Sequence, residues 1–174
     1  MRKILSVVDM QKDFIDGALG FEGADRIIPG IAARIKEYVE AGDEIVYTLD
    51  THSENYMETQ EGKNLPVPHC IKGSDGWGLC EELKPLLSGK KCFEKPAFGS
   101  IGLAEYLKEN AAGISAIEVC GLVSNICVVS NAVIAKAAAP EAEVIVDSSL
   151  TASFAPDLHQ ATLDVLKGIQ VTVL

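Results

Sequence analysis

The clearest indication of the architecture is the segment IEVCGLVSNICVVSNAVIAKAAA, residues 117–139. Its first part, 117–122, is an apolar run rich in β-branched residues and predicts a buried strand. Its second part, 125–139, predicts a helix, which must end before Pro140 because proline cannot continue it. A strand that passes directly into a helix is typical of one repeating unit of a parallel sheet.

The same alternation of strand and helix patterns runs through the rest of the chain. Six strands are predicted, at residues 4–8, 44–49, 91–94, 117–122, 143–147 and 169–174. Four helices are predicted, at residues 27–41, 103–111, 125–139 and 158–167. Such alternation favours an α/β fold, a three-layer α/β/α arrangement around a mostly parallel six-stranded sheet. The length of 174 residues suits a single domain, residues 1–174.

Composition excludes several classes of function. The formal net charge of -10 argues against a nucleic-acid partner, which calls for a clustered basic face. No apolar run approaches the roughly 18 residues that a membrane span needs. The first residues carry no secretory pattern, and the five cysteines form an odd set without C-x-x-C spacing. Reduced thiols and a cytoplasmic location are therefore expected.

Reactive side chains follow several of the predicted strands. Asp9 and Asp50 come at the ends of the first and second strands, Lys95 follows the third, and Cys127 lies just past the fourth. In open α/β sheets, ligands bind beyond the carboxyl ends of the strands, so these four side chains should meet in one crevice. Asp147, after the fifth strand, is interpreted instead as a capping residue.

Cys127 is the candidate nucleophile. Ser124 is a suitable N-cap, which would place Cys127 in the first helical turn. There the helix dipole and free N–H groups favour a thiolate and can hold an oxyanion. Asp9 could accept the thiol proton, and the ammonium group of Lys95 could lower the pKa of both partners. The alternative is a cysteine that serves only as a small buried apolar residue.

The long irregular stretch 50–84 carries candidate metal ligands. Asp50-Thr51-His52 places a carboxylate beside an imidazole, and His69 follows later in the same stretch. Oxygen and imidazole donors without thiolates suit Zn, Mn or Fe. The alternative is that both histidines are structural.

Two motifs resemble those of the isochorismatase-like cysteine hydrolases. These are D-x-Q-x-D-F, at residues 9–14, and G-x-x-x-x-x-C-V, at residues 121–128, with Lys95 between them. The resemblance covers nearly the whole chain and implies a Rossmann-like sheet with Asp9, Lys95 and Cys127 as the catalytic triad. It also implies that the backbone N–H groups of Val123 and Cys127 hold the oxyanion, and that the peptide bond before Val123 is cis.

Within that family, the loop resembles that of the nicotinamidases. Asp50, His52 and His69 match the metal ligands of that branch residue for residue. A further ligand varies among its members. Glu61 best resembles the members that use a glutamate, and Glu58 is the alternative because it falls where other members have a histidine.

Two aromatic residues typical of nicotinamidases are missing. Thr51 and Pro66 stand in their places. Substrate stacking must then come from elsewhere, and Phe14 and Phe98 are the candidates.

The resemblance implies hydrolysis of nicotinamide to nicotinate and ammonia through a cysteine thioester, as in NAD salvage. One divalent ion, Zn, Mn or Fe, would hold the pyridine nitrogen, and Asp9 or the ion would activate the water that cleaves the thioester. A homo-oligomer is expected, as in many relatives. One alternative is a hydrolase of another small amide or ureide, although metal-free relatives have no need of the Asp50, His52 and His69 set. The other is a non-catalytic ligand-binding protein of the same fold.

Overall fold

The computed structural model describes residues 1–174 and contains one sheet in which every strand pair is parallel. The strands are β1 (Arg2–Val8), β2 (Glu44–Asp50), β3 (Lys91–Lys95), β4 (Ile114–Leu122), β5 (Glu143–Val146), β6 (Thr151–Ala152) and β7 (Thr172–Val173). Their order is β3-β2-β1-β4-β5-β7, and β6 pairs with the end of β4. The sheet thus has one strand more than predicted, because two residues are too few to show a strand period.

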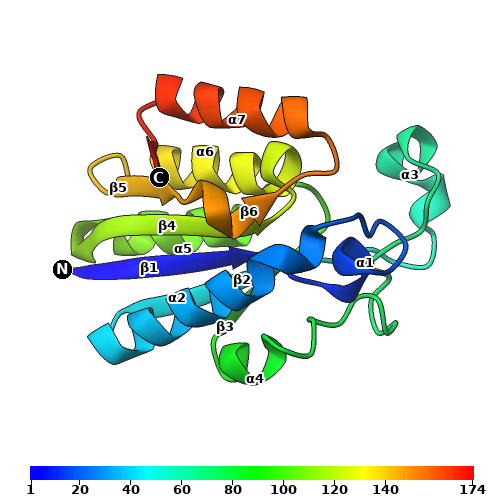
Figure 1. The fold of residues 1–174 in the computed structure, drawn as a ribbon, viewed down its shortest axis with the longest axis horizontal. Coiled ribbons are helices and arrows are strands. Elements are labelled where there is room, and N and C mark those ends of the chain that lie inside the picture. The colour runs from blue at the N-terminus through cyan, green and yellow to red at the C-terminus, as the bar shows by residue number, and fades with distance from the viewer.

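Helices cover both faces of this sheet, as the α/β/α prediction requires. They are α1 (Lys12–Ile15), α2 (Ile28–Ala41), α3 (Gln60–Asn64), α4 (Lys84–Leu87), α5 (Ile101–Asn110), α6 (Val129–Ala138) and α7 (Pro156–Gly168). Single 3₁₀ turns occupy Ala24–Ile27, Tyr56–Glu58, Ala111–Gly113 and Ser148–Leu150. Helix α2 lies in front of the sheet in Figure 1, and α5 and α6 lie behind it.

The predicted end of α2 at Gly42 is confirmed. Gly42 has φ 72°, a left-handed conformation that glycine adopts without the strain a Cβ would bring. The next N–H group, that of Asp43, donates to the carbonyl of Tyr38 at 2.9 Å, which satisfies one of the last carbonyls of the helix. The turn returns the chain directly into β2.

The core forms two layers, one on each face of the sheet. Along β1, Ile4 and Val8 belong to the cluster under α5, α6 and α7, whereas Leu5 and Val7 belong to the cluster under α2. Successive side chains of a strand point to opposite faces, so a continuous apolar run is what a doubly covered strand requires. Burial on both faces fixes the register of β1 and therefore the place where its polar successor, Asp9, emerges.

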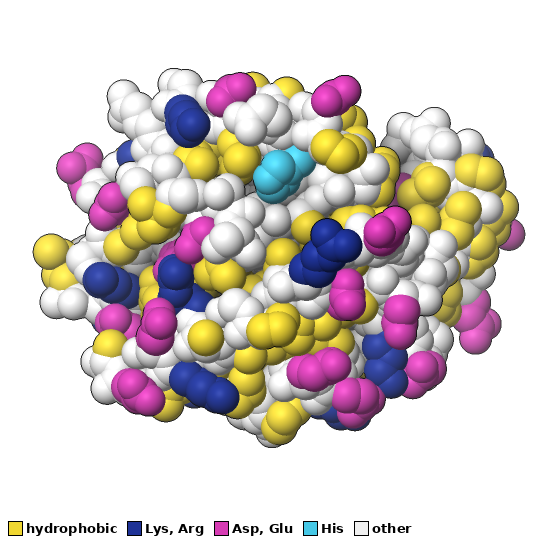
Figure 2. Space-filling view, in the orientation of Figure 1, with side chains coloured by type: hydrophobic (Ala, Val, Ile, Leu, Met, Phe, Trp, Pro, Cys, Tyr) yellow, Lys and Arg dark blue, Asp and Glu magenta, His cyan; other side chains and the backbone are white.

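The carboxyl ends of the strands point toward α1 and α3 at one edge of the molecule (Figure 1). Charged side chains of both signs are spread over the face shown in Figure 2, and acidic ones gather over the region where α1 lies. No helix of the chain is both long enough and apolar enough to cross a membrane.

Candidate active site

The three candidate catalytic residues meet at the carboxyl edge of the sheet. Lys95 Nζ lies 2.7 Å from Asp9 Oδ2 and 3.4 Å from Cys127 Sγ, and all three side chains are buried. The hydroxyl of Thr48 donates a 2.6 Å hydrogen bond to the other oxygen of Asp9. Parallel strands that end at the same edge of the sheet bring these residues together, as their positions at or after the ends of β1, β3 and β4 predicted.

The charges of the triad determine where its proton resides. Burial raises the pKa of Asp9, although the charge of Lys95 acts in the opposite direction. Burial, and then the charge of Asp9, raises the pKa of the Cys127 thiol well above its usual range. For Lys95, burial favours the neutral amine, but the charges of Asp9, Cys127 and Asp50 more than offset it and raise the pKa. Burial and the charge of Asp9 thus favour the neutral thiol of Cys127, and Lys95 lies in an ion pair with Asp9.

Cys127 lies in what we call the nucleophile turn, residues 121–128. It includes a π-helical turn, Ser124–Val128, that leads into α6 and places Cys127 in the first helical turn, as predicted. The peptide bond between Leu122 and Val123 is cis, as the resemblance implied. Gly121 has φ 113°, and a Cβ there would lie 2.1 Å from the carbonyl oxygen of Val8, so only glycine fits.

The predicted N-cap role of Ser124 is wrong. Its side chain makes no capping bond, and the N–H of Ile126 donates instead to the carbonyl of Val123 at 3.0 Å. The hydroxyl of Ser124 is hydrogen-bonded to His159 Nδ1 at 2.9 Å. The capping role of Asp147 is confirmed, since its carboxylate accepts the N–H of Ser149 at 2.9 Å.

The predicted metal ligands form a second group, the donor cluster, made of Asp50, His52, His69 and Glu61. One donor atom from each of Asp50, His52 and His69 lies within 4.8 Å of the other two, and all three residues are buried. Glu61 Oε1, from α3, lies 3.7 Å from Nε2 of both histidines. Glu58 is exposed and takes no part in the cluster.

The donor cluster fits a divalent cation. Two imidazoles and two carboxylates form a borderline donor set that suits Zn, Mn or Fe. His69 Nδ1 is paired with the carbonyl of Val67 at 2.8 Å, which leaves Nε2 facing Asp50 Oδ2 at 3.3 Å. Burial and the neighbouring charge of Asp50 raise the pKa of Glu61, a repulsion that a bound cation would relieve.

Lys95 joins the two groups. Its Nζ lies 3.2 Å from Asp50 Oδ1, so one ammonium group contacts both the candidate base, Asp9, and a candidate metal ligand. Burial alone would raise the pKa of Asp50, but hydrogen bonds from His52 and His69 and the charge of Lys95 lower it. Asp50 is thereby kept as a carboxylate, the form that binds a cation.

Gln11, the glutamine of the D-x-Q-x-D-F motif, is a supporting residue for which the sequence predicted no role. Its side-chain amide donates to the carbonyl of Asp50 at 2.9 Å and accepts the N–H of Asp50 at 2.7 Å. Thr48, the partner of Asp9, was also missed. The signal was present, since Thr48 is two residues before Asp50 and strand alternation places both on one face.

The two candidate substrate contacts lie in different surroundings. Phe98 is 47 % exposed and lines a cavity of about 510 Å³ together with His52, Glu61 and Ile126. Phe14 is 6 % exposed and does not line that cavity. Its ring instead packs edge-on against that of His69, with 5.7 Å between the two ring centroids. Ile126, which the sequence did not single out, is a further wall of the cavity.

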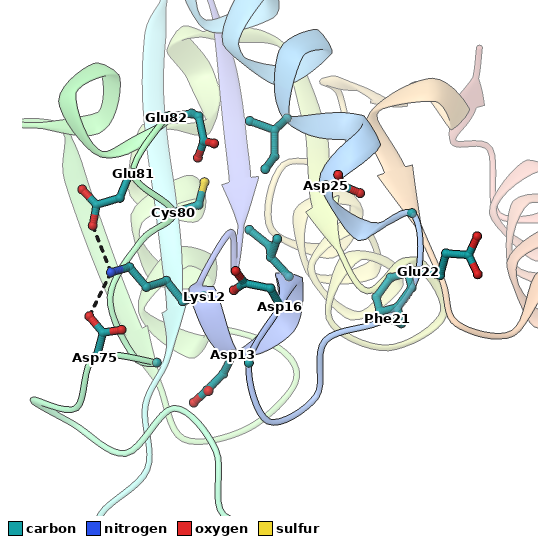
Figure 3. Close-up of a pocket in the computed structure, with 15 residues that line it drawn as sticks. Lys12, Asp13, Asp16, Phe21, Glu22, Asp25, Asp75, Cys80, Glu81 and Glu82 are labelled. Atoms are coloured by element: carbon teal, nitrogen blue, oxygen red, sulfur yellow. Dashed lines mark hydrogen bonds and ion pairs between the residues drawn. The ribbon is translucent and has the colours of Figure 1, made fainter.

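A larger cavity, of about 860 Å³, lies beside α1 and contains none of the triad or donor-cluster residues. Figure 3 shows its acidic lining, where Lys12 reaches between Asp75 at 2.8 Å and Glu81 at 2.9 Å. By volume alone, this cavity would be the better candidate for the reactive site. We instead place the reactive site where buried titratable groups converge, because perturbed groups in a cleft are the better indicator of chemistry.

The fold and site define a three-layer α/β/α protein with a buried Asp–Lys–Cys constellation beside a donor cluster. The family model described as the isochorismatase domain matches residues 3–174, and the chain belongs to that family. It is 28 % identical to the nicotinamidase of Acinetobacter baylyi over a 202-residue alignment covering 95 % of this chain and 90 % of that protein.

Two solved structures are similar over essentially their whole length. The nicotinamidase/pyrazinamidase of Bacillus subtilis is 28 % identical with a TM-score of 0.87, over 99 % of both chains. The pyrazinamidase of Pyrococcus horikoshii in complex with zinc is 27 % identical with a TM-score of 0.83, over 100 % of this chain and 99 % of that one.

Proposed function

We propose that this protein is a metal-dependent amidohydrolase that converts nicotinamide to nicotinate and ammonia through a thioester on Cys127. The observation that carries the proposal is the contact of one lysine, Lys95, with the nucleophile, the base and a metal ligand. This contact joins a nucleophilic site to a cation site. The similarity to a nicotinamidase and to a zinc-bound pyrazinamidase supports the same function.

The donor cluster supplies the anchor for the ring. Asp50, His52, His69 and Glu61 would hold one divalent ion. When bound, the ion would take the pyridine nitrogen as a ligand and orient the ring, so that proximity contributes to the rate. The cavity lined by Phe98 and Ile126 adjoins the cluster and would enclose the apolar ring.

Acylation then follows from the triad. Asp9 accepts the proton of the Cys127 thiol as sulfur attacks the carboxamide carbon, and Lys95 balances the negative charge that passes between them. The backbone N–H groups of Val123 and Cys127 hold the developing oxyanion. Asp9, whose raised pKa suits it to give the proton back, protonates the amide nitrogen, which leaves as ammonia. In the second half-reaction Asp9 removes a proton from water, which cleaves the thioester to nicotinate.

Compartment and assembly complete the proposal. All five cysteines are free thiols in the structure, which supports a reducing compartment, the cytoplasm. A shallow apolar groove lined by Phe98, Val133 and Ile134 supports a homo-oligomer.

Comparing nicotinamide with benzamide tests the ring anchor. Benzamide has the same carboxamide and ring shape but no ring nitrogen. We expect kcat/KM for benzamide to be lower by at least about 100-fold, because a site built for a polar partner rejects the analogue that lacks it. Pyrazinamide keeps a nitrogen at the same position and serves as the matched control. Equal kcat/KM for nicotinamide and benzamide would contradict the role of the donor cluster.

Replacing His52 by alanine tests the donor cluster directly. We expect at least about a 100-fold loss of zinc affinity and a higher KM for nicotinamide, because one of four ligands is removed. Metal content by mass spectrometry after dialysis is the readout. Glu61→Gln should also lose metal, whereas the exposed Glu58→Gln should retain it. Full metal content in His52→Ala would remove His52 from the ligand set.

A further inference from the structure

The segment 151–159 contacts the nucleophile turn through β6, Ser153 and His159. Its first two residues form β6, which pairs in parallel with Gly121 and Leu122 at the end of β4. The hydroxyl of Thr151 donates to the carbonyl of Gly121 at 2.8 Å. Figure 1 shows β6 beside the end of β4, with the chain running on into α7. This segment therefore contacts the turn at the point where the turn begins to leave the sheet.

The residue after β6, Ser153, makes a further contact with the nucleophile turn through its side chain. The hydroxyl of Ser153 donates to Asn125 Oδ1 at 2.7 Å and accepts the N–H of Ala155 at 2.9 Å. Ser153 thus links the residue after Ser124 to the start of α7. The loop between β6 and α7 follows the nucleophile turn instead of leaving it.

The third contact, the hydrogen bond between His159 and Ser124, connects α7 to the middle of the nucleophile turn. Ser124 is only 1 % exposed, and a buried hydroxyl requires a hydrogen-bond partner. Nδ1 of His159, 35 residues away in the sequence, supplies it at 2.9 Å. Ser124 directly follows Val123, the proposed oxyanion donor, and precedes Cys127 by one helical turn. Its side chain has no other role in the proposed chemistry.

His159 occupies a position where packing alone would favour an apolar residue. It continues the inward stripe of α7, with Thr162, Leu163 and Leu166 following at helical spacing, all three of them buried. At the end of this stripe, where α7 packs against the nucleophile turn, the chain has a half-buried imidazole. The hydrogen bond to Ser124 accounts for a polar ring in that place.

We propose that His159 is a positioning residue for the nucleophile turn. By holding Ser124, it fixes the backbone that carries the N–H of Val123 on one side and Cys127 on the other. It acts through Ser124 and touches neither substrate nor metal. The kinetic part of the test rests on the proposed function, and a second readout does not.

The kinetic test uses His159→Ala, Ser124→Ala and the double variant. We expect each single change to lower kcat for nicotinamide about tenfold, with KM within twofold, because a small displacement of the reacting groups is costly. The double variant should fall no further, since both changes remove the same bond. His159→Asn, whose amide can reach Ser124, should recover most of the rate. Gln160→Ala, on the exposed side of α7, is the matched control.

Alkylation of Cys127 by iodoacetamide, mapped by peptide mass spectrometry, is the second readout and needs no substrate. We expect His159→Ala to slow it several-fold in protein that is still folded at the assay temperature, because the thiol is no longer held against Lys95. This readout holds even if nicotinamide proves not to be the substrate. Unchanged kcat and alkylation in His159→Ala would overturn the proposal. Losses that multiply in the double variant, or no recovery in His159→Asn, would also overturn it.

Discussion

Replacing Cys127 by alanine is expected to abolish turnover of nicotinamide and to leave its binding intact. The proposed nucleophile is lost, while the donor cluster and the cavity wall are untouched. Removal of a nucleophile costs a hydrolase on the order of 10⁴- to 10⁶-fold in kcat. Ammonia release measures the rate, and calorimetry measures the dissociation constant of nicotinamide on the same variant.

Cys92→Ala is the matched control for this change. Cys92 is a half-buried cysteine on β3, outside the triad, and its removal should leave kcat within about twofold. Turnover by Cys127→Ala at more than about a hundredth of the normal rate would rule out the thioester route.

Replacing Asp9 by asparagine should have opposite effects on turnover and on thiol reactivity. Asparagine cannot accept the thiol proton, so we expect kcat to fall by about 10³-fold, within the range of general acid–base catalysis. The charge of Asp9 raises the pKa of Cys127, whereas that of Lys95 lowers it. Burial and the weaker effect of Asp50, which also raise this pKa, are unchanged in Asp9→Asn, and the lowering charge of Lys95 stays. Because the largest raising charge is removed, the pKa of the thiol should fall.

The rate of Cys127 alkylation as a function of pH measures that second effect. We expect the midpoint of the profile to shift to lower pH in Asp9→Asn, so that the thiol reacts faster at neutral pH while catalysis is slower. Thr48→Val is the control: it removes only the hydroxyl that donates to Asp9 and keeps the charge of Asp9, so the midpoint should shift less. A midpoint that stays in place or rises in Asp9→Asn would contradict the charge arrangement described for the triad.

The positions of the strands made much of the site predictable. Asp9 and Asp50 come at the carboxyl ends of largely buried apolar strands, β1 and β2, whose burial leaves little freedom of register. Lys95 ends the edge strand β3, and the parallel pairing of β3 with β2 places it opposite Asp50. The carboxyl ends of parallel strands meet at one edge, so residues far apart in the sequence could be placed together from the strand pattern alone. Cys127 was predictable for the same reason, because it follows β4 at the start of a helix.

The features that local sequence patterns could not predict depend on contacts between distant segments. Strand β6 has two residues and exists only because the end of β4 is available to pair with it. Serine is a residue type that favours the N-cap position, but the hydroxyl of Ser124 is hydrogen-bonded to His159, 35 residues further along the chain. Phe14 was expected against the substrate, yet its ring packs against His69, and its role as a substrate contact stays a prediction. In each case tertiary packing overrides a local preference.

The choice between Glu58 and Glu61 shows the same limit. Both fall in the loop before His69, and spacing alone could not separate them. The short helix α3 turns Glu61 inward to 3.7 Å from both histidines, while Glu58 stays exposed. Glu61 as the variable ligand is therefore the proposal that the geometry supports.

The most direct test of the proposed function is ammonia release from nicotinamide by the purified protein, with the metal content determined on the same sample. We expect a kcat within the usual enzymatic range, about 1 to 10³ s⁻¹, from protein that holds about one divalent ion per chain. Protein that holds the metal but releases no ammonia from nicotinamide would contradict the proposed function.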